Sequence, residues 1–231
     1  MIAIVVLTLI VCALTVDYLV LRLPQRQTAV QASVGDNPAI HVDRTHMWLL
    51  PEASGLARVG IDEVASLLIG RPERIEWAPA GLVTRGAPLA VVIAGGRRLT
   101  LRSPVDGAVV EENPALAASP LDIATNPLDK GWLVRLRPAN LAAQLAEMRS
   151  GTRLRDWSRQ EMARLRDFIL ARSHASNLVG ATAMDGGELD LGAAGRLDEA
   201  AFADAVRMVF ADEPSGAIAT TKATSQKAVT P

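Results

Sequence analysis

The sequence predicts a mainly β domain with added α-helices, with one transmembrane helix before it and a helical segment after it. Three observations lead to this fold class. An apolar run without a charge fills residues 1–16 and continues, interrupted by Asp17, to Leu21. Short β-type runs separated by Gly and Pro fill most of 41–140, and helical patterns dominate 139–210. The 231 residues supply enough apolar mass for one or two domains.

Residues 1–23 are long enough to cross a bilayer. About 20 apolar residues, at about 1.5 Å each, span a hydrocarbon core of about 30 Å. A cleavable signal peptide is the alternative, but no basic residue precedes the run and no small-x-small site follows it. Arg22 and Arg26 follow the run, so the positive-inside rule predicts a single-pass membrane protein whose soluble part lies in the cytoplasm. Residues 24–40 are polar and lack periodicity, which predicts a linker.

The β-type runs define the domain predicted for 41–150. They have the close spacing of a small sandwich or barrel. The runs are 47–50, 56–60, 74–77, 88–93, 99–101, 108–111 and 132–136. Residues 61–69 interrupt them and predict a short helix that ends at Gly70. The Gly95-Gly96 pair between two runs predicts a two-residue hairpin, because the turns that close such hairpins need positive φ.

The segment 151–211 is predicted to be helical. Within it, apolar residues recur at helical spacing over 155–175 and 197–210, and residues 183–189 predict a turn. Residues 139–149, at the end of the predicted β domain, have the same helical spacing. Residues 212–231 are dominated by Ser, Thr, Ala, Pro and Lys, so we expect a disordered tail.

Composition argues against several function classes. The net charge is −1 and basic residues do not alternate with aromatic ones, so nucleic acid is not an expected partner. Cys12 is the single cysteine and there are three histidines, which argues against a metal site. His46 is interpreted as a residue early in a β-strand. Without a phosphate loop or a Ser/His/Asp pattern, we expect no catalytic residues and no enzyme activity.

Four groups of residues in 41–140 carry a family resemblance. They are His46-Met-Trp48, Ala57-Arg-Val-Gly60-Ile61, Ser103-Pro-Val-Asp-Gly107 with Val109-Val-Glu-Glu-Asn113, and Asn126-Pro-Leu-Asp-Lys-Gly131-Trp132-Leu-Val. In order and spacing they resemble the glycine cleavage system H-protein, a lipoyl-domain protein. The resemblance implies the flattened β-barrel, or barrel-sandwich hybrid, of lipoyl and biotinyl carriers.

The resemblance also implies where a lipoyl group would be attached. In the family, a lysine within Glu-Ser-Val-Lys-Ala at the hairpin tip is amidated by lipoic acid. Counting back from Ser103-Pro104 without gaps places this lysine on Gly96 and the glutamate on Ile93. Residues 23–129 contain no lysine, and a guanidinium stays protonated and is not the amine that lipoylation needs. We therefore expect no lipoyl cofactor.

These observations predict a non-catalytic, membrane-anchored, H-protein-like accessory or scaffold subunit of a membrane complex, with a redox complex as the favoured class. The expected partners are the lipid bilayer and other subunits of that complex. The hairpin residues Arg97, Arg98 and Arg102 are candidates for docking to an acidic partner.

Two alternatives stay open. One is a divergent H-protein-type carrier that is modified at an unrecognised site such as Lys130. The other is a membrane-fusion adaptor of an export system, which also joins one N-terminal span to a lipoyl-like domain.

Overall fold

The structure is a computed structural model that describes residues 34–175 and 189–210. The transmembrane helix predicted for 1–23, nearly all of the turn at 183–189 and the tail 212–231 lie outside these residues. Of the helices within the described ranges, none combines the length and the apolar character that crossing a membrane requires.

Two antiparallel sheets make up the β part of the fold. The larger sheet has the strand order β1-β2-β3-β9-β8-β5, and the smaller sheet has the order β4-β6-β7. The strands are β1 (His41–Val42), β2 (Met47–Pro51), β3 (Ala57–Ile61), β4 (Arg74–Trp77), β5 (Leu82–Val83), β6 (Pro88–Ala94), β7 (Arg97–Arg102), β8 (Gly107–Glu112) and β9 (Val134–Pro138). The mainly β prediction is confirmed: each of the seven predicted runs corresponds to a strand within two residues at either end.

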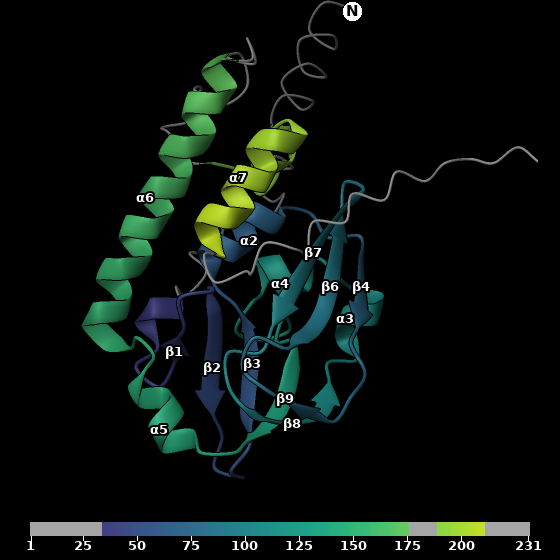
Figure 1. Cartoon of the computed structure of the whole chain (residues 1–231), viewed down its shortest axis with the longest axis vertical. Helices are drawn as coiled ribbons and strands as arrows, with labels where there is room; N and C mark the ends of the chain where they lie inside the picture. The colour runs from purple at the N-terminus through teal and green to yellow at the C-terminus, as the bar shows by residue number, and fades with distance from the viewer. Residues whose placement is uncertain (1–33, 176–188, 211–231) are drawn as a thin grey trace, which may run out of the picture. The chain divides into compact units, whose positions relative to one another are not determined.

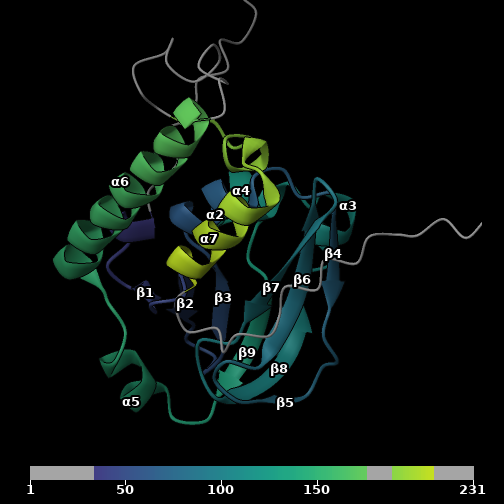
Figure 2. The ribbon, with the colours of Figure 1, turned by 45° about the horizontal axis from the view of Figure 1, so that its top comes forward.

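Six α-helices and two short 3-10 helices accompany the sheets in the described ranges. They are α2 (Glu63–Ile69), α3 (Ala115–Ala118), α4 (Asp122–Thr125), α5 (Leu141–Ala146), α6 (Gly151–Ala175) and α7 (Glu199–Val209), with the short 3-10 helices η1 (Val34–Asp36) and η2 (Ala194–Arg196). Figures 1 and 2 both show α2, α6 and α7 side by side, and the three helices contact one another. Asp198 begins α7 by accepting a hydrogen bond from the backbone N–H of Ala201 at 2.7 Å, as an N-cap residue does.

One hydrophobic core joins the sheets to the C-terminal helices. Val59 of β3 and Val92 of β6 belong to the same buried cluster as Leu165 and Ile169 of α6 and Val209 of α7. The described part of the segment 151–211 therefore packs as part of the β domain, since its apolar faces are buried in the core of that domain.

A second, smaller core ties the start of the described chain to α6. Val34 and Ile40 are buried against Val42, Trp48 and Leu154. Residues 34–40, which the sequence assigns to the linker, therefore belong to the domain. The polar residues that separate these two apolar side chains conceal this in the sequence.

The aromatic ring of Trp48 packs against the backbone of Gly60. A β-carbon at Gly60 would lie 2.5 Å from Cζ2 of Trp48, closer than any side chain tolerates. The pairing of β2 with β3 places these two residues opposite each other. The first two family motifs therefore meet in the core, where one needs a large ring and the other needs no side chain.

Candidate functional site

The β6–β7 hairpin forms as the sequence predicts. Gly95 and Gly96 make the turn with φ of 55° and 76°, the two positive values that a type I′ hairpin requires. Gly96 is exposed, and a β-carbon there would meet no atom within 4 Å. The position that the family resemblance gives to the lipoyl lysine is thus open at the hairpin tip, but the chain presents no amine there.

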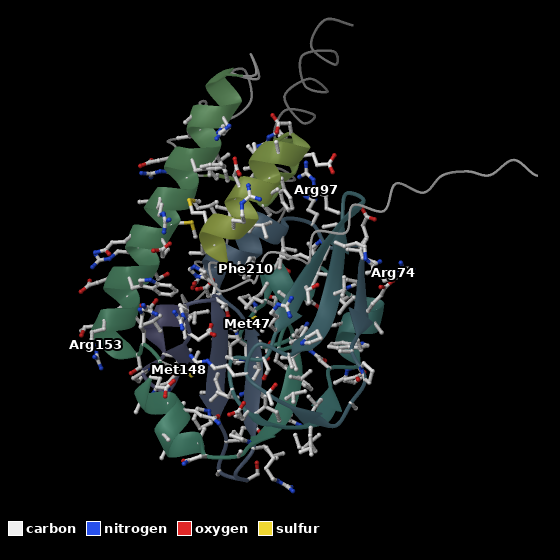
Figure 3. The ribbon with its side chains drawn as sticks, in the orientation of Figure 1. Met47, Arg74, Arg97, Met148, Arg153 and Phe210 are labelled. Atoms are coloured by element: carbon white, nitrogen blue, oxygen red, sulfur yellow. The ribbon has the colours of Figure 1, made fainter. Side chains whose placement is uncertain are left out.

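The guanidinium of Arg97, next to this turn, is bound within the chain. Its Nη1 donates to the carbonyl of Ala194 at 3.2 Å and its Nη2 donates to the carbonyl of Leu197. The same group lies over the ring of Phe202, 4.2 Å from the ring centre. Figure 3 shows Arg97 beside α7. Burial lowers the pKa of Arg97, and the carboxylates of Glu199 and Asp198 oppose that shift.

A cleft of about 210 Å³ lies between the hairpin, the end of α2 and the C-terminal segment. Val92, Leu99, Leu191 and Phe202 give it apolar walls. Glu73 fixes the hairpin edge of the cleft by accepting a hydrogen bond from the backbone N–H of Gly95 at 3.0 Å. The lining residues include no serine, cysteine or histidine, so they supply no hydroxyl or thiol nucleophile and no imidazole base.

The other two arginines of the predicted patch also make contacts. Arg98 forms an ion pair with Glu76 of β4, and this interaction lowers the pKa of Glu76. The Nη1 of Arg102 donates to the carbonyl of Gly86 at 3.0 Å. The hairpin thus brings the three arginines onto one strand, but Arg97 is engaged by the C-terminal segment. Docking of an acidic partner to these residues remains a prediction.

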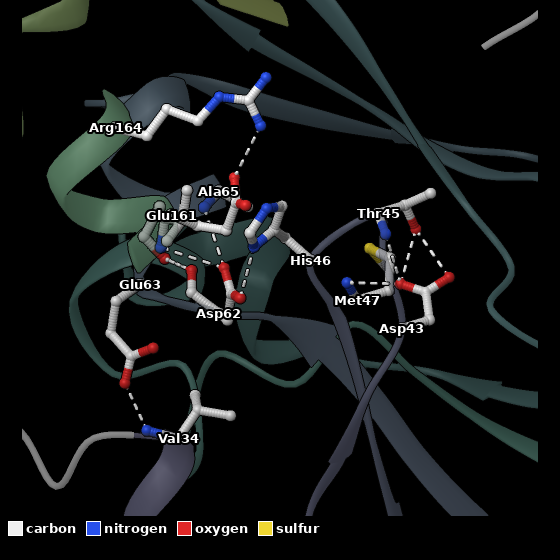
Figure 4. Close-up of polar contacts among 12 residues, drawn as sticks. Val34, Asp43, Thr45, His46, Met47, Asp62, Glu63, Ala65, Glu161 and Arg164 are labelled. Atoms are coloured by element: carbon white, nitrogen blue, oxygen red, sulfur yellow. Dashed lines mark hydrogen bonds and ion pairs between the residues drawn. The ribbon is translucent and has the colours of Figure 1, made fainter. Parts of the chain in front are cut away.

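His46 forms a buried pair with Asp62, which the sequence does not reveal. Nδ1 of His46 lies 2.7 Å from Oδ2 of Asp62, and both side chains are 1% exposed (Figure 4). The other carboxylate oxygen of Asp62 caps α2 by accepting two backbone N–H groups. The ring of Trp157 stacks on the histidine at 4.5 Å between ring centres. His46 lies in the turn just before β2, with a φ of 59°, and not in the strand where the sequence places it. The contacts therefore join this turn to the start of α2 and to α6. In the described ranges, no cluster of three or more His, Cys, Asp or Glu side chains could hold a metal ion.

Sequence signals for this pair exist but are partial. An aspartate directly before an apolar helical run is an N-cap signature, which points to Asp62. Nothing in the spacing identifies its second partner, which lies 16 residues earlier.

Asp43 is a second buried acid. Its carboxylate accepts hydrogen bonds from the hydroxyl and N–H of Thr45 and from the N–H of Met47, and so shapes the turn into β2 (Figure 4). Burial raises the pKa of Asp43, although these hydrogen bonds and the charge of Arg85 oppose the shift.

Lys130 is exposed in the turn before β9. The side-chain amide of Asn113 donates to the carbonyls of Lys130 and Trp132, both at 2.7 Å. The family motifs around Asn113 and Trp132 thus hold the backbone of this turn. Lys130 contributes its carbonyl to that structure.

The chain is similar in sequence to known proteins. The sequence model of the family "Glycine cleavage H-protein" matches residues 40–159. The glycine cleavage system H protein of Halorhodospira halophila is 32% identical over 98 residues, 42% of this chain and 75% of that protein. The one from Thermus thermophilus is 33% identical over 99 residues, 42% of this chain and 77% of that protein.

A solved structure is also similar. The crystal structure of a glycine cleavage system H protein from Mycobacterium marinum has a TM-score of 0.41 and 29% identity, and the match covers 45% of this chain and 86% of that one. The family match to residues 40–159 extends over more than half of the 231 residues. On that ground, the chain belongs to the glycine cleavage H-protein family.

Proposed function

We propose that this chain is a non-catalytic, membrane-anchored accessory subunit of a membrane complex that uses the H-protein fold without lipoylation. The observation that carries the proposal is the hairpin tip. Gly96 stands where the family resemblance places the lysine, and residues 23–129 contain no lysine. An amide bond to lipoic acid needs a free amine, and guanidinium groups do not supply one.

The contacts of Arg97 support a structural role for the hairpin. In a carrier, the tip must leave its attached arm free to move between sites. Here the residue beside the tip holds the C-terminal segment through two backbone carbonyls and a ring face. The hairpin thus stabilises the domain.

The apolar residues 1–23 support the membrane anchor. Arg22 and Arg26 favour the orientation in which the domain lies in the cytoplasm. The partners of this subunit are the bilayer and other subunits of the complex, with a redox complex as the class we favour.

Intact-mass analysis of the protein purified from its own host tests the carrier question. The expected mass has no lipoyl group, and a lipoyl-sized adduct on Lys130 would establish the carrier alternative instead. The matched control is Gly96→Lys, expressed with a lipoate ligase. A lysine at Gly96 meets no neighbouring atom, although the φ of 76° at this position strains any residue other than glycine by about 1–2 kcal/mol. This variant should gain the adduct while the natural sequence does not, and unfolding of the variant must first show that the domain still folds.

Purification from native membranes in mild detergent tests the accessory role. Stoichiometric recovery of integral membrane subunits is the expected result. Recovery of glycine cleavage enzymes would support the carrier alternative, and recovery of an outer-membrane export channel would support the adaptor.

A further inference from the structure

Helix α6 concentrates positive charge in a chain that is close to neutral. It carries six arginines against three carboxylates, so its net charge is +3, whereas the whole chain has a net charge of −1. The rest of the chain therefore carries −4. All the basic side chains of α6 other than His174 are arginines; the helix contains no lysine. At about 100° per residue, Arg155, Arg159 and Arg166 lie within about 40° of one another around the helix axis.

The arginines of α6 point to solvent. Arg159 is 79% exposed, and the side chains of Arg153 and Arg155 are exposed and make no hydrogen bond or ion pair with any described residue. Arg159 and Arg166 pair with carboxylates of their own helix. Such exposed pairs are weak and exchange readily for another anion.

Arg155, Arg159 and Arg166 form one surface of α6, the arginine face. This face begins beside the residue at which the described chain starts. Leu154 lies between Arg153 and Arg155 in the sequence and packs in the cluster that contains Val34. The ten residues 24–33 separate Val34 from the predicted membrane span, and they reach no farther than about 35 Å in any arrangement. If residues 1–23 are the anchor, the covalent chain therefore keeps this part of α6 within reach of the bilayer surface.

We propose that the exposed arginine face of α6 binds the phosphate groups of anionic phospholipids in the membrane that holds the chain. This inference rests on the anchor of the proposed function. A guanidinium matches phosphate geometry with two parallel hydrogen bonds, which favours arginine over lysine at such a contact. Each basic residue near an anionic membrane strengthens the association by about fivefold, so even part of this face is sufficient to orient a tethered domain.

Chemical modification of arginine tests the proposal on the full chain. The protein is reconstituted in vesicles of phosphatidylcholine, with or without phosphatidylglycerol, and treated with hydroxyphenylglyoxal; modified peptides are quantified by mass spectrometry. Arg155, Arg159 and Arg166 should react about fivefold more slowly in the anionic vesicles. High salt should remove the difference because it screens exposed charges. Arg74 of β4, 66% exposed and far from Arg153 in Figure 3, is the internal reference.

Charge-reversal variants test whether the arginine face is the part of the chain that contacts the anionic lipid. Arg155→Glu combined with Arg159→Glu should abolish the protection of Arg166, whereas the matched control Arg74→Glu should leave it unchanged. Equal reaction rates in both vesicle types would overturn the proposal. So would protection that occurs in native membranes but not in pure lipid, because that result identifies an acidic protein as the partner.

Carbonate extraction separates this proposal from the anchor on which it rests. If carbonate removes the chain from membranes, the anchor and the lipid contact built on it are both refuted. If the chain stays in the membrane but its arginines react equally in both vesicle types, only the lipid contact is refuted.

Discussion

Replacing Arg97 by alanine should loosen the C-terminal segment without unfolding the sheets. The substitution removes two hydrogen bonds from a charged donor, worth about 1.5 kcal/mol each at the low end of the usual range. It also removes a cation–π contact with Phe202, worth about 0.5–1 kcal/mol. Relief of the burial that lowers the pKa of Arg97 offsets part of this loss. The expected net loss is about 2–3 kcal/mol in the free energy that holds α7 against the domain.

Hydrogen exchange measures this loss residue by residue. The amides of Phe202 and Phe210, which donate within and at the end of α7, should exchange about 30- to 150-fold faster in Arg97→Ala. Amides of β2 and β3 should change much less. Arg98→Ala is the matched control, because its ion pair with Glu76 is exposed and worth about 1 kcal/mol at most. Unchanged exchange in α7, or an equal effect of Arg98→Ala, would refute the reasoning.

Three further substitutions test the interior of the domain. Gly60→Ala should lower the free energy of unfolding, measured with denaturant, by about 1–3 kcal/mol and shift the fluorescence of Trp48, because the new methyl group collides with that ring. The control Gly195→Ala should lower it much less, because a β-carbon there meets no atom within 4 Å. Asp62→Ala should cost about 2–4 kcal/mol, since it removes the cap of α2 and the partner of a buried histidine; an unchanged unfolding midpoint would contradict this. Asp43→Asn tests the raised pKa: this carboxyl contributes stability at low pH that is lost as pH rises from its ordinary value of 3.8 through the raised value. The natural chain should therefore gain stability relative to Asp43→Asn on acidification through that window, and parallel pH profiles of unfolding would rule the raised pKa out.

The hairpin was predictable because its determinants are local. Two adjacent glycines between β-type runs require no information from elsewhere in the chain, and the turn formed where they stand. The contacts of Arg97 were not predictable in this way. Its two carbonyl partners lie 97 and 100 residues farther along the chain, and no rule of spacing connects them. The sequence therefore indicated a basic patch, and the structure adds that one of its members binds within the domain.

Two other differences between the predicted and the observed structure have local causes: one strand is very short, and a few buried residues stand among polar ones. Strand β5 contains two residues, Leu82 and Val83, too few for an alternating pattern to be recognised. At the start of the described chain, Val34 and Ile40 are buried but stand among polar residues, so composition predicted a linker there. Family motifs located the residues that shape the core, such as Gly60, because their order along the chain is distinctive.

The common core of the sheets and the C-terminal helices has a consequence for synthesis on the ribosome. Leu136 of β9 is made more than 70 residues before Val209 of α7, and both belong to that core. At a synthesis rate of about 5–20 residues per second, α7 is completed about 4–15 s after the last strand of the sheets. During that interval the growing chain exposes apolar surface. If residues 1–23 insert first, the incomplete domain is held beside the membrane until α7 has been synthesised.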